Sequence, residues 1–142
     1  MDVTFTQVAE VRIIALRDKP VPFRAALRYS STDPLAVQVI LPAEATRGGW
    51  PRTWVFARDL LSEGLNKDAG SGSVRIWSCC PSGTVLEFHS AGEILPVQFR
   101  TAVLARFLRC SYALVAPGKE DVGGALERSL DSVMRDGPVQ RE

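Results

Sequence analysis

The chain has 142 residues, of which 46% are hydrophobic and 23% are charged, and its formal net charge is +1. This composition excludes a disordered chain and predicts a single domain over residues 1–142, with a core over about 3–135. Near-neutral charge counts against a protein that depends on non-specific phosphate binding, because such binding requires concentrated positive charge.

The first part of the chain has the two-residue period of β-strands. Apolar side chains alternate with polar ones through residues 3–15, 21–30 and 35–41. The turn sequence Ser31-Thr32-Asp33-Pro34 separates the second stretch from the third. We therefore expect an antiparallel meander of three strands, in which strand edges such as residues 21–30 need cover.

Residues 54–65 change from a strand pattern to a helix pattern. The residues of interest are Trp54, Phe56, Arg58, Asp59, Leu60, Leu61 and Gly64. Trp54 and Phe56 share one face of a strand, and we expect both of them and Leu60 to be buried. Arg58 and Asp59 are expected to make local contacts at the elbow, where the first helical amides need acceptors. Gly64 is expected to end the helix, because only glycine takes a left-handed backbone at low cost.

The second half predicts three more strands and then helices. The strands fall at residues 73–80, 84–90 and 93–99 and form a second antiparallel meander. Thr101 is expected to cap a helix whose apolar stripe consists of Val103, Leu104, Phe107, Leu108 and Tyr112. Asp121 starts a last expected helix, which ends at Gly137-Pro138. The fold class is therefore α+β: two antiparallel three-stranded meanders packed with helices.

Groups that carry catalysis or bind metals are few. His89 is the single histidine, and on a strand it is more simply a structural residue than a general base, although pairing with Cys79, Cys80 or Ser82 across neighbouring strands is conceivable. Cys79 and Cys80 are adjacent, so a regular strand would point them to opposite faces and prevent joint chelation. We expect no enzyme, no metal and no cofactor.

Features of the cysteines and of the chain start indicate the compartment. An odd count of three cysteines makes a poor disulfide framework. The first residues lack the charged and apolar regions of a secretory leader, and no apolar run approaches the ~20 residues that span a bilayer. We expect a cytoplasmic protein.

Two surface interpretations compete with a purely structural one. A single-stranded nucleic-acid site would use strand arginines and aromatic stacking faces, namely Arg12, Arg24, Arg28, Arg75, Arg100, Trp54, Trp77 and Phe88. The net charge makes this interpretation the weaker one, and we expect these aromatics to fill the core instead. Arg47, Trp50 and Arg52 lie in a glycine-rich loop and are candidates for protein contact, since Trp and Arg are enriched at contact hot spots. The alternative is that Trp50 folds back over the first meander.

Residues 54–65 resemble the WVFARDLL-type signature of the SsgA-like proteins, an actinomycete family that controls sporulation-specific cell division. Further matches follow in the family's order: Leu27-Arg28-Tyr29, Asp33-Pro34, Ala36-Val37, residues 70–72, Val74-Arg75-Ile76-Trp77, Ala105-Arg106-Phe107-Leu108, Val115, Pro117-Gly118 and Glu120. The similarity spans roughly residues 5–135, and the chain departs from the family in the 42–52 loop and at Cys79-Cys80.

The resemblance implies small, non-enzymatic cytoplasmic proteins that are recruited to division septa and act by protein contact. One family member localises to future septum sites and recruits the tubulin-like division protein FtsZ, and another helps to place it. The resemblance also implies a whirly-like fold of two antiparallel sheets with helices, assembled as a trimer. Related whirly folds bind single-stranded nucleic acid, which keeps that alternative open.

Overall fold

A computed structural model of the protein describes residues 2–14, 21–46, 48–70, 72–90 and 92–119. Over these ranges the chain forms one antiparallel sheet with the strand order β4-β3-β2-β1-β7-β6-β5. The strands are β1 (Thr4–Ile13), β2 (Val21–Ser30), β3 (Ala36–Leu41), β4 (Arg52–Ala57), β5 (Val74–Cys80), β6 (Gly83–Ser90) and β7 (Glu93–Arg100). The α+β class is confirmed, but the division into two separate three-stranded meanders is wrong.

Two features of pairing replace the expected meanders. β4 extends the first meander to a fourth strand by pairing with β3 along its whole length, from Ala36↔Ala57 to Leu41↔Arg52. The second feature is that β1 pairs with β7 and so joins the two meanders into one sheet. Ile13 pairs with Val97, and the Ile14 amide donates to the Pro96 carbonyl at 3.0 Å. β2 is consequently an inner strand with partners on both sides, so the expectation that residues 21–30 form an edge needing cover is wrong.

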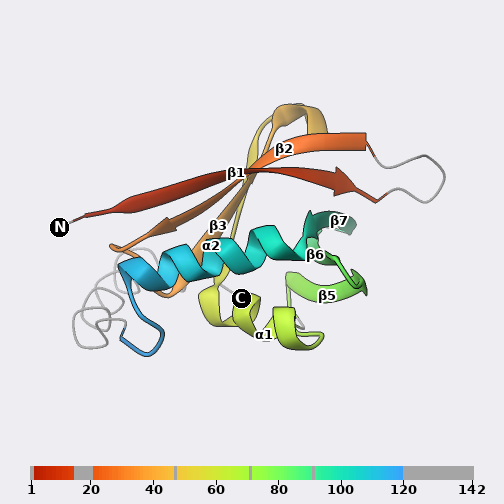
Figure 1. The fold of residues 1–142 in the computed structure, drawn as a ribbon. Helices are drawn as coiled ribbons and strands as arrows, with labels where there is room; N and C mark the ends of the chain where they lie inside the picture. Colours follow the sequence, from red (N-terminus) through yellow and green to blue (C-terminus); the bar gives the residue numbers. More distant parts are fainter. Residues whose placement is uncertain (1, 15–20, 47, 71, 91, 120–142) are drawn as a thin grey trace.

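In the part of the chain that the structure describes, two α-helices cover the inner face of the sheet. They are α1 (Arg58–Asn66) and α2 (Thr101–Leu114), and a short 3-10 helix, η1 (Ala43–Ala45), follows β3. Figure 1 shows α2 lying between the long β1–β2 hairpin and α1. The expected stripe on α2 is confirmed, because Leu104, Phe107 and Leu108 are buried and pack into the common core.

The sheet curls until its two ends approach each other. The Trp54 ring of β4 stacks on the Phe88 ring of β6 with centroids 4.9 Å apart, and Phe56 lies 6.4 Å from the same ring. α1 follows β4 directly and packs against β5, which places it between the two edge strands. The elbow at residues 57–58 therefore turns the chain from one end of the curled sheet onto the other.

Thr101 does not cap α2 as expected. The cap position is Arg100, without a side-chain cap, and the Thr101 hydroxyl instead hydrogen-bonds the Thr84 hydroxyl at 2.7 Å. Because Thr84 is buried on β6, its hydroxyl needs a partner, and Thr101 supplies it. The last expected helix, from Asp121 to Gly137-Pro138, lies outside the described residues. Within those residues, no helix is long and apolar enough to cross a membrane.

Candidate protein-contact site

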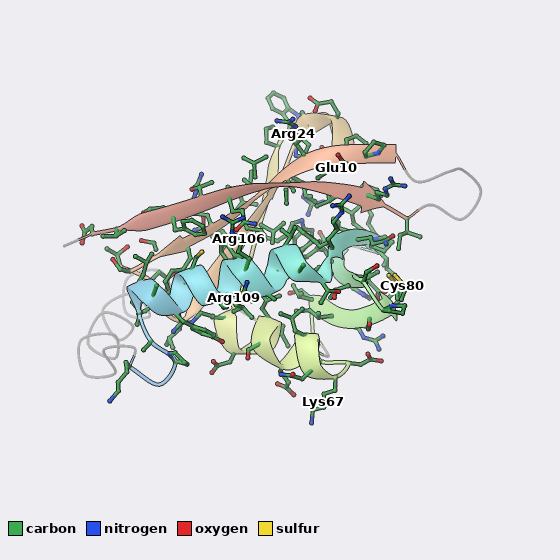
Figure 2. The ribbon with its side chains drawn as sticks, in the orientation of Figure 1. Glu10, Arg24, Lys67, Cys80, Arg106 and Arg109 are labelled. Carbon is green, nitrogen blue, oxygen red and sulfur yellow. The ribbon has the colours of Figure 1, made fainter. Side chains whose placement is uncertain are left out.

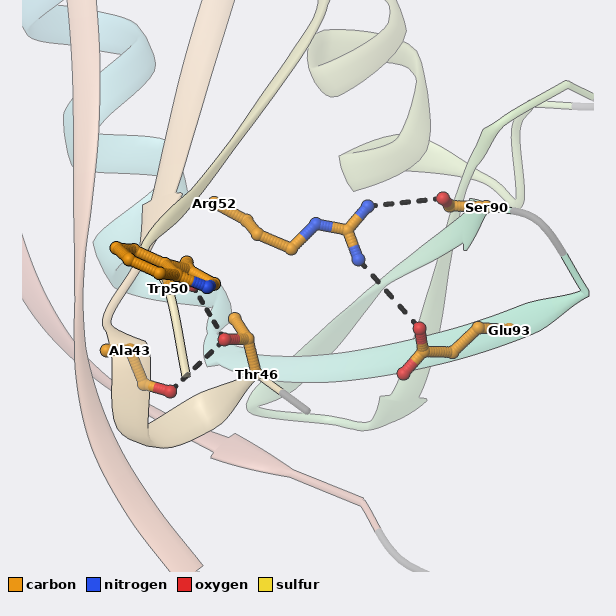
Figure 3. A network of polar contacts seen from close by, with 6 residues as sticks. All are labelled: Ala43, Thr46, Trp50, Arg52, Ser90 and Glu93. Atoms are coloured by element: carbon orange, nitrogen blue, oxygen red, sulfur yellow. Dashed lines mark hydrogen bonds and ion pairs between the residues drawn. The ribbon is translucent and has the colours of Figure 1, made fainter. Parts of the chain in front are cut away.

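The loop between β3 and β4 presents Trp50 to solvent. The Thr46 hydroxyl is shared between two backbone carbonyls, that of Ala43 at 3.1 Å and that of Trp50 at 2.7 Å (Figure 3). Gly49 adopts a φ of 72°, which the neighbouring turn requires and which favours glycine. The Trp50 side chain is 76% exposed, so the alternative in which it folds back over the meander is wrong. The Trp50 carbonyl is therefore anchored, while the Trp50 side chain stays uncovered.

Arg52 sits beside this loop, but its guanidinium is engaged within the molecule. Its Nη2 donates to Ser90 Oγ at 3.2 Å, and its Nη1 lies 3.9 Å from a Glu93 carboxylate oxygen (Figure 3). The guanidinium carbon also lies 4.6 Å from the centre of the Trp54 ring, within cation–π distance. Arg52 thus ties β4 to the β6–β7 hairpin. The third candidate, Arg47, lies outside the described residues.

Arg58 is the buried centre of the family signature. It is 1% exposed, and its Nη1 donates to the carbonyls of Ser111 at 3.2 Å and Val115 at 2.7 Å. The guanidinium carbon lies 4.8 Å from the ring centres of both Tyr29 and Tyr112. A positive charge at the last carbonyls of a helix complements the helix dipole. Arg58 therefore caps the C-terminal end of α2 from a distant part of the sequence.

Arg58 reaches well beyond the local contacts that the sequence predicts for the elbow. Its side chain donates to Ser111 and Val115, which lie more than fifty positions further along the chain. The Arg58 backbone amide donates to the carbonyl of Leu35, the residue before β3, at 2.8 Å. The first amide of α1 thus finds its acceptor in the neighbouring strand region and not in Asp59. Asp59 itself is exposed in the first turn of α1, where a negative charge is favourable.

The other signature residues pack in the interior to different degrees. Phe56 and Leu61 are fully buried, whereas Trp54 and Leu60 are half-buried, so the expected burial holds completely only for Phe56 among the three predicted residues. Gly64 does not end the helix, since α1 continues to Asn66. A Cβ at Gly64 would lie 2.5 Å from the Ile76 Cβ. Gly64 is thus required for the close approach of α1 to β5.

His89 belongs to a small polar chain on the outer face of the sheet. Its Nε2 lies 2.6 Å from Glu87 Oε1, and the other oxygen of Glu87 accepts the Trp77 indole N–H at 3.3 Å. The conceivable pairing of His89 with Cys79, Cys80 or Ser82 is wrong, because Cys80 pairs with Gly83 at the opposite end of β6, about 20 Å away along the strand. No group of three potential metal ligands occurs among the residues that the structure describes.

The nucleic-acid interpretation loses two of its three stacking residues. Phe88 is buried, and Trp54 faces it in the interior, so neither ring offers a free face to a base. The arginines proposed for that site are exposed, namely Arg12, Arg24, Arg28, Arg75 and Arg100. Glu10 pairs with Arg24 in register, and Figure 2 places both on the side of the β1–β2 hairpin away from α2. A negative charge therefore lies beside at least one of these arginines.

Comparison with known proteins supports the resemblance of the 54–65 segment. The family model described as "Streptomyces sporulation and cell division protein, SsgA" matches residues 23–120. Sporulation-specific cell division protein SsgB of Salinispora tropica is 40% identical over 127 residues, which cover 84% of this chain and 88% of that protein. SsgB of Streptomyces coelicolor is 31% identical over 138 residues, covering 94% of this chain and 98% of that protein.

Solved structures show the same fold. One is a structure of SsgB, from work in which mutations in SsgB correlate to longitudinal cell division during sporulation of Streptomyces coelicolor. It has a TM-score of 0.75 at 32% identity, over 84% of this chain and 94% of that one. An SsgA-like sporulation-specific cell division protein from Thermobifida fusca has a TM-score of 0.77 at 27% identity, over 92% of this chain and 95% of that one. The family model covers well over half of the sequence, and the chain belongs to the SsgA family of sporulation and cell division proteins.

Proposed function

We propose that this chain is a non-enzymatic regulator of sporulation-specific cell division that localises or recruits the division machinery, FtsZ, to septum sites by protein contact. Its relatives are named as sporulation-specific cell division proteins. The observation that carries the contact mode is Trp50, which is 76% exposed and whose carbonyl accepts a hydrogen bond from the Thr46 hydroxyl. Tryptophan is enriched at protein-contact hot spots, and the hydrogen bond to the Trp50 carbonyl anchors the backbone that carries this exposed side chain.

The proposal is tested by imaging in sporulating hyphae. A fluorescent fusion of this chain replaces the resident family member of an actinomycete host that also carries labelled FtsZ. We expect the fusion to coincide with FtsZ at the developing septa. A fusion that stays diffuse in the cytoplasm while FtsZ rings assemble normally would contradict the recruiting role.

The chain is further proposed to act as a trimer, the assembly that the family resemblance implies. An apolar row on the outer face of the sheet is available for the contact: Val8 is 61% exposed, Ala26 lies opposite it, and Ile40 lies opposite Ala26. Isolated exposed apolar residues are normal, but a row across three strands is typical of an interface.

Val8→Arg places a charge at the β1 end of this row, on its most exposed side chain, and should separate the subunits, because an unpaired charge is costly to bury between protomers. Sedimentation equilibrium at tens of micromolar is expected to give three times 15.5 kDa for the unsubstituted chain and a smaller mass for the variant. A 15.5 kDa monomer of the unsubstituted chain would remove the trimer.

Binding to single-stranded nucleic acid would contradict the proposed protein-contact role. Fluorescence anisotropy with a labelled single-stranded oligonucleotide should show no micromolar binding at physiological salt. Tight binding that weakens steeply as salt rises would show a phosphate-binding surface and replace the contact role with a single-strand-binding one.

A further inference from the structure

Cys79 and Cys80 lie on the same face of β5, although neighbouring residues of a regular strand point to opposite faces. The cause is a β-bulge: the register of β5 with β6 runs from Ser78↔Thr84 directly to Cys80↔Gly83, so Cys79 is the extra residue. The expectation that the two side chains cannot act together is therefore wrong. The Cys79 thiol donates to the Cys80 sulfur at 3.6 Å.

The turn that follows is shaped to receive both sulfur atoms. A Cβ on Gly83 would lie 2.7 Å from the Cys80 sulfur and 2.8 Å from the Cys79 sulfur, so both sulfur atoms occupy the space beside this glycine that a larger residue's Cβ would need. Both cysteines are nevertheless exposed, and Figure 2 shows Cys80 at the outer end of the β5–β6 hairpin. The two thiols are thus adjacent, accessible and seated over one glycine.

The surroundings make the two thiols unequal. Hydrogen bonds, first from the Cys79 thiol and then from the Ser82 backbone, lower the pKa of Cys80. Partial burial, followed by the hydrogen bond with Cys80, raises the pKa of Cys79. Cys80 consequently carries the larger share of thiolate near neutral pH, and the thiolate is the reactive form of cysteine.

We propose that Cys79 and Cys80 form a redox-active dithiol that reacts with low-molecular-weight disulfides. The Cys80 thiolate attacks one sulfur of the small disulfide, which forms a mixed disulfide on Cys80 and releases the first small thiolate. Cys79 then loses its proton and attacks the Cys80 sulfur, which closes a Cys79–Cys80 disulfide and releases the second small thiolate. The protein loses two electrons and two protons, and the small disulfide becomes two thiols.

The site adjoins the start of α2. The Ser82 carbonyl accepts the first amide of that helix, from Thr101, at 2.9 Å. Closing the ring brings the sulfurs from 3.6 Å to a bonding distance of about 2.05 Å, so the turn must adjust next to this hydrogen bond. The third cysteine, Cys110, is half-buried on α2 and takes no part in the dithiol.

The test uses 5,5′-dithiobis(2-nitrobenzoic acid), an aromatic disulfide whose released thiolate is coloured. In a Cys110→Ser background, the Cys79–Cys80 pair should release two coloured thiolates per chain and retain no label. Intact mass should fall by about 2 Da, the loss of two hydrogens. Cys79→Ser should release one thiolate and retain one label on Cys80. Cys80→Ser should likewise release one thiolate and retain one label, now on Cys79. Peptide mapping of the unsubstituted chain should likewise find no label on the peptide that carries Cys79 and Cys80. The Cys110 peptide is counted separately.

Two results would overturn the proposal. One is retention of a label on each of Cys79 and Cys80, which would show two independent thiols. The other is an intact mass of the Cys110→Ser chain that does not fall by about 2 Da, which would show that no Cys79–Cys80 disulfide forms.

Discussion

At the scale of single residues, the family signature is explained by packing and capping. Arg58 holds the end of α2 through the Ser111 and Val115 carbonyls and is enclosed by Tyr29 and Tyr112. The Tyr29 hydroxyl in turn donates to the Pro34 carbonyl at 2.9 Å, which fixes the turn before β3. One guanidinium thus connects β2, the start of α1 and the end of α2. We interpret the signature as a structural device rather than a contact surface.

Arg58→Lys should destabilise the protein by about 2–4 kcal/mol, because an ammonium group cannot lie flat between two rings while reaching both carbonyls. Urea denaturation of this variant is compared with that of Arg106→Lys, a matched change at an exposed position of α2. The control should change stability by less than about 0.5 kcal/mol. Equal, small effects of both substitutions would mean that the planar fork of Arg58 is not needed.

Gly64→Ala should also destabilise the protein, although alanine is the better helix former by about 1 kcal/mol. The added Cβ would lie 2.5 Å from the Ile76 Cβ, so α1 would have to move away from β5. Overpacking of this kind costs about 1–3 kcal/mol. A variant as stable as the parent, or more stable, in urea denaturation would show that α1 can shift freely. The cost should shrink in an Ile76→Ala background, since that change removes part of the obstruction.

At the scale of elements, β4 and α1 together close the curled sheet. Trp54 stacks on Phe88 with the ring planes 20° apart, and Arg52 covers the same indole while binding Ser90. These contacts join the β4 end of the sheet to β6, which pairs with β5 at the other end. The alternation of residues 54–56 thus places Trp54 and Phe56 on the face that closes the sheet, and α1 follows directly.

Trp54→Ala should cost about 3 kcal/mol, as the loss of a large, half-buried aromatic side chain from the core. Trp50→Ala is the matched control, because the same chemical change at a 76% exposed side chain should leave stability almost unchanged. Chemical denaturation of the two variants under identical conditions gives the comparison. A loss below about 1 kcal/mol for Trp54→Ala would place Trp54 on the surface rather than at the closure of the sheet.

At the scale of the whole molecule, the sequence predicts what depends on local periodicity. Alternation locates the strands around residues 21–30, 84–90 and 93–99, and the spacing of Leu104, Phe107 and Leu108 locates the buried face of α2. These elements are specified by neighbouring residues, so their patterns can be read without knowing the fold.

Other features depend on partners that are distant in the sequence. The junction at Ile13 and Val97 has the same alternating pattern as any strand pair, and nothing near Arg58 indicates that it binds Ser111. The bulge at Cys79 is set by the pairing of Cys80 with Gly83, and the alternation of residues 73–80 does not signal it. The exposure of Trp50 can be predicted from the sequence, because glycine-rich, polar loops rarely pack densely.

We propose that the chain acts at septa through protein contact at Trp50, and septal recruitment of a Trp50→Ala fusion tests this proposal most directly. The matched control is Ile94→Ala, which shortens another large apolar side chain that is 58% exposed. We predict that the Trp50→Ala fusion loses its septal signal with unchanged thermal unfolding, while Ile94→Ala is recruited like the parent chain. Undiminished recruitment of a folded Trp50→Ala fusion would contradict the claim.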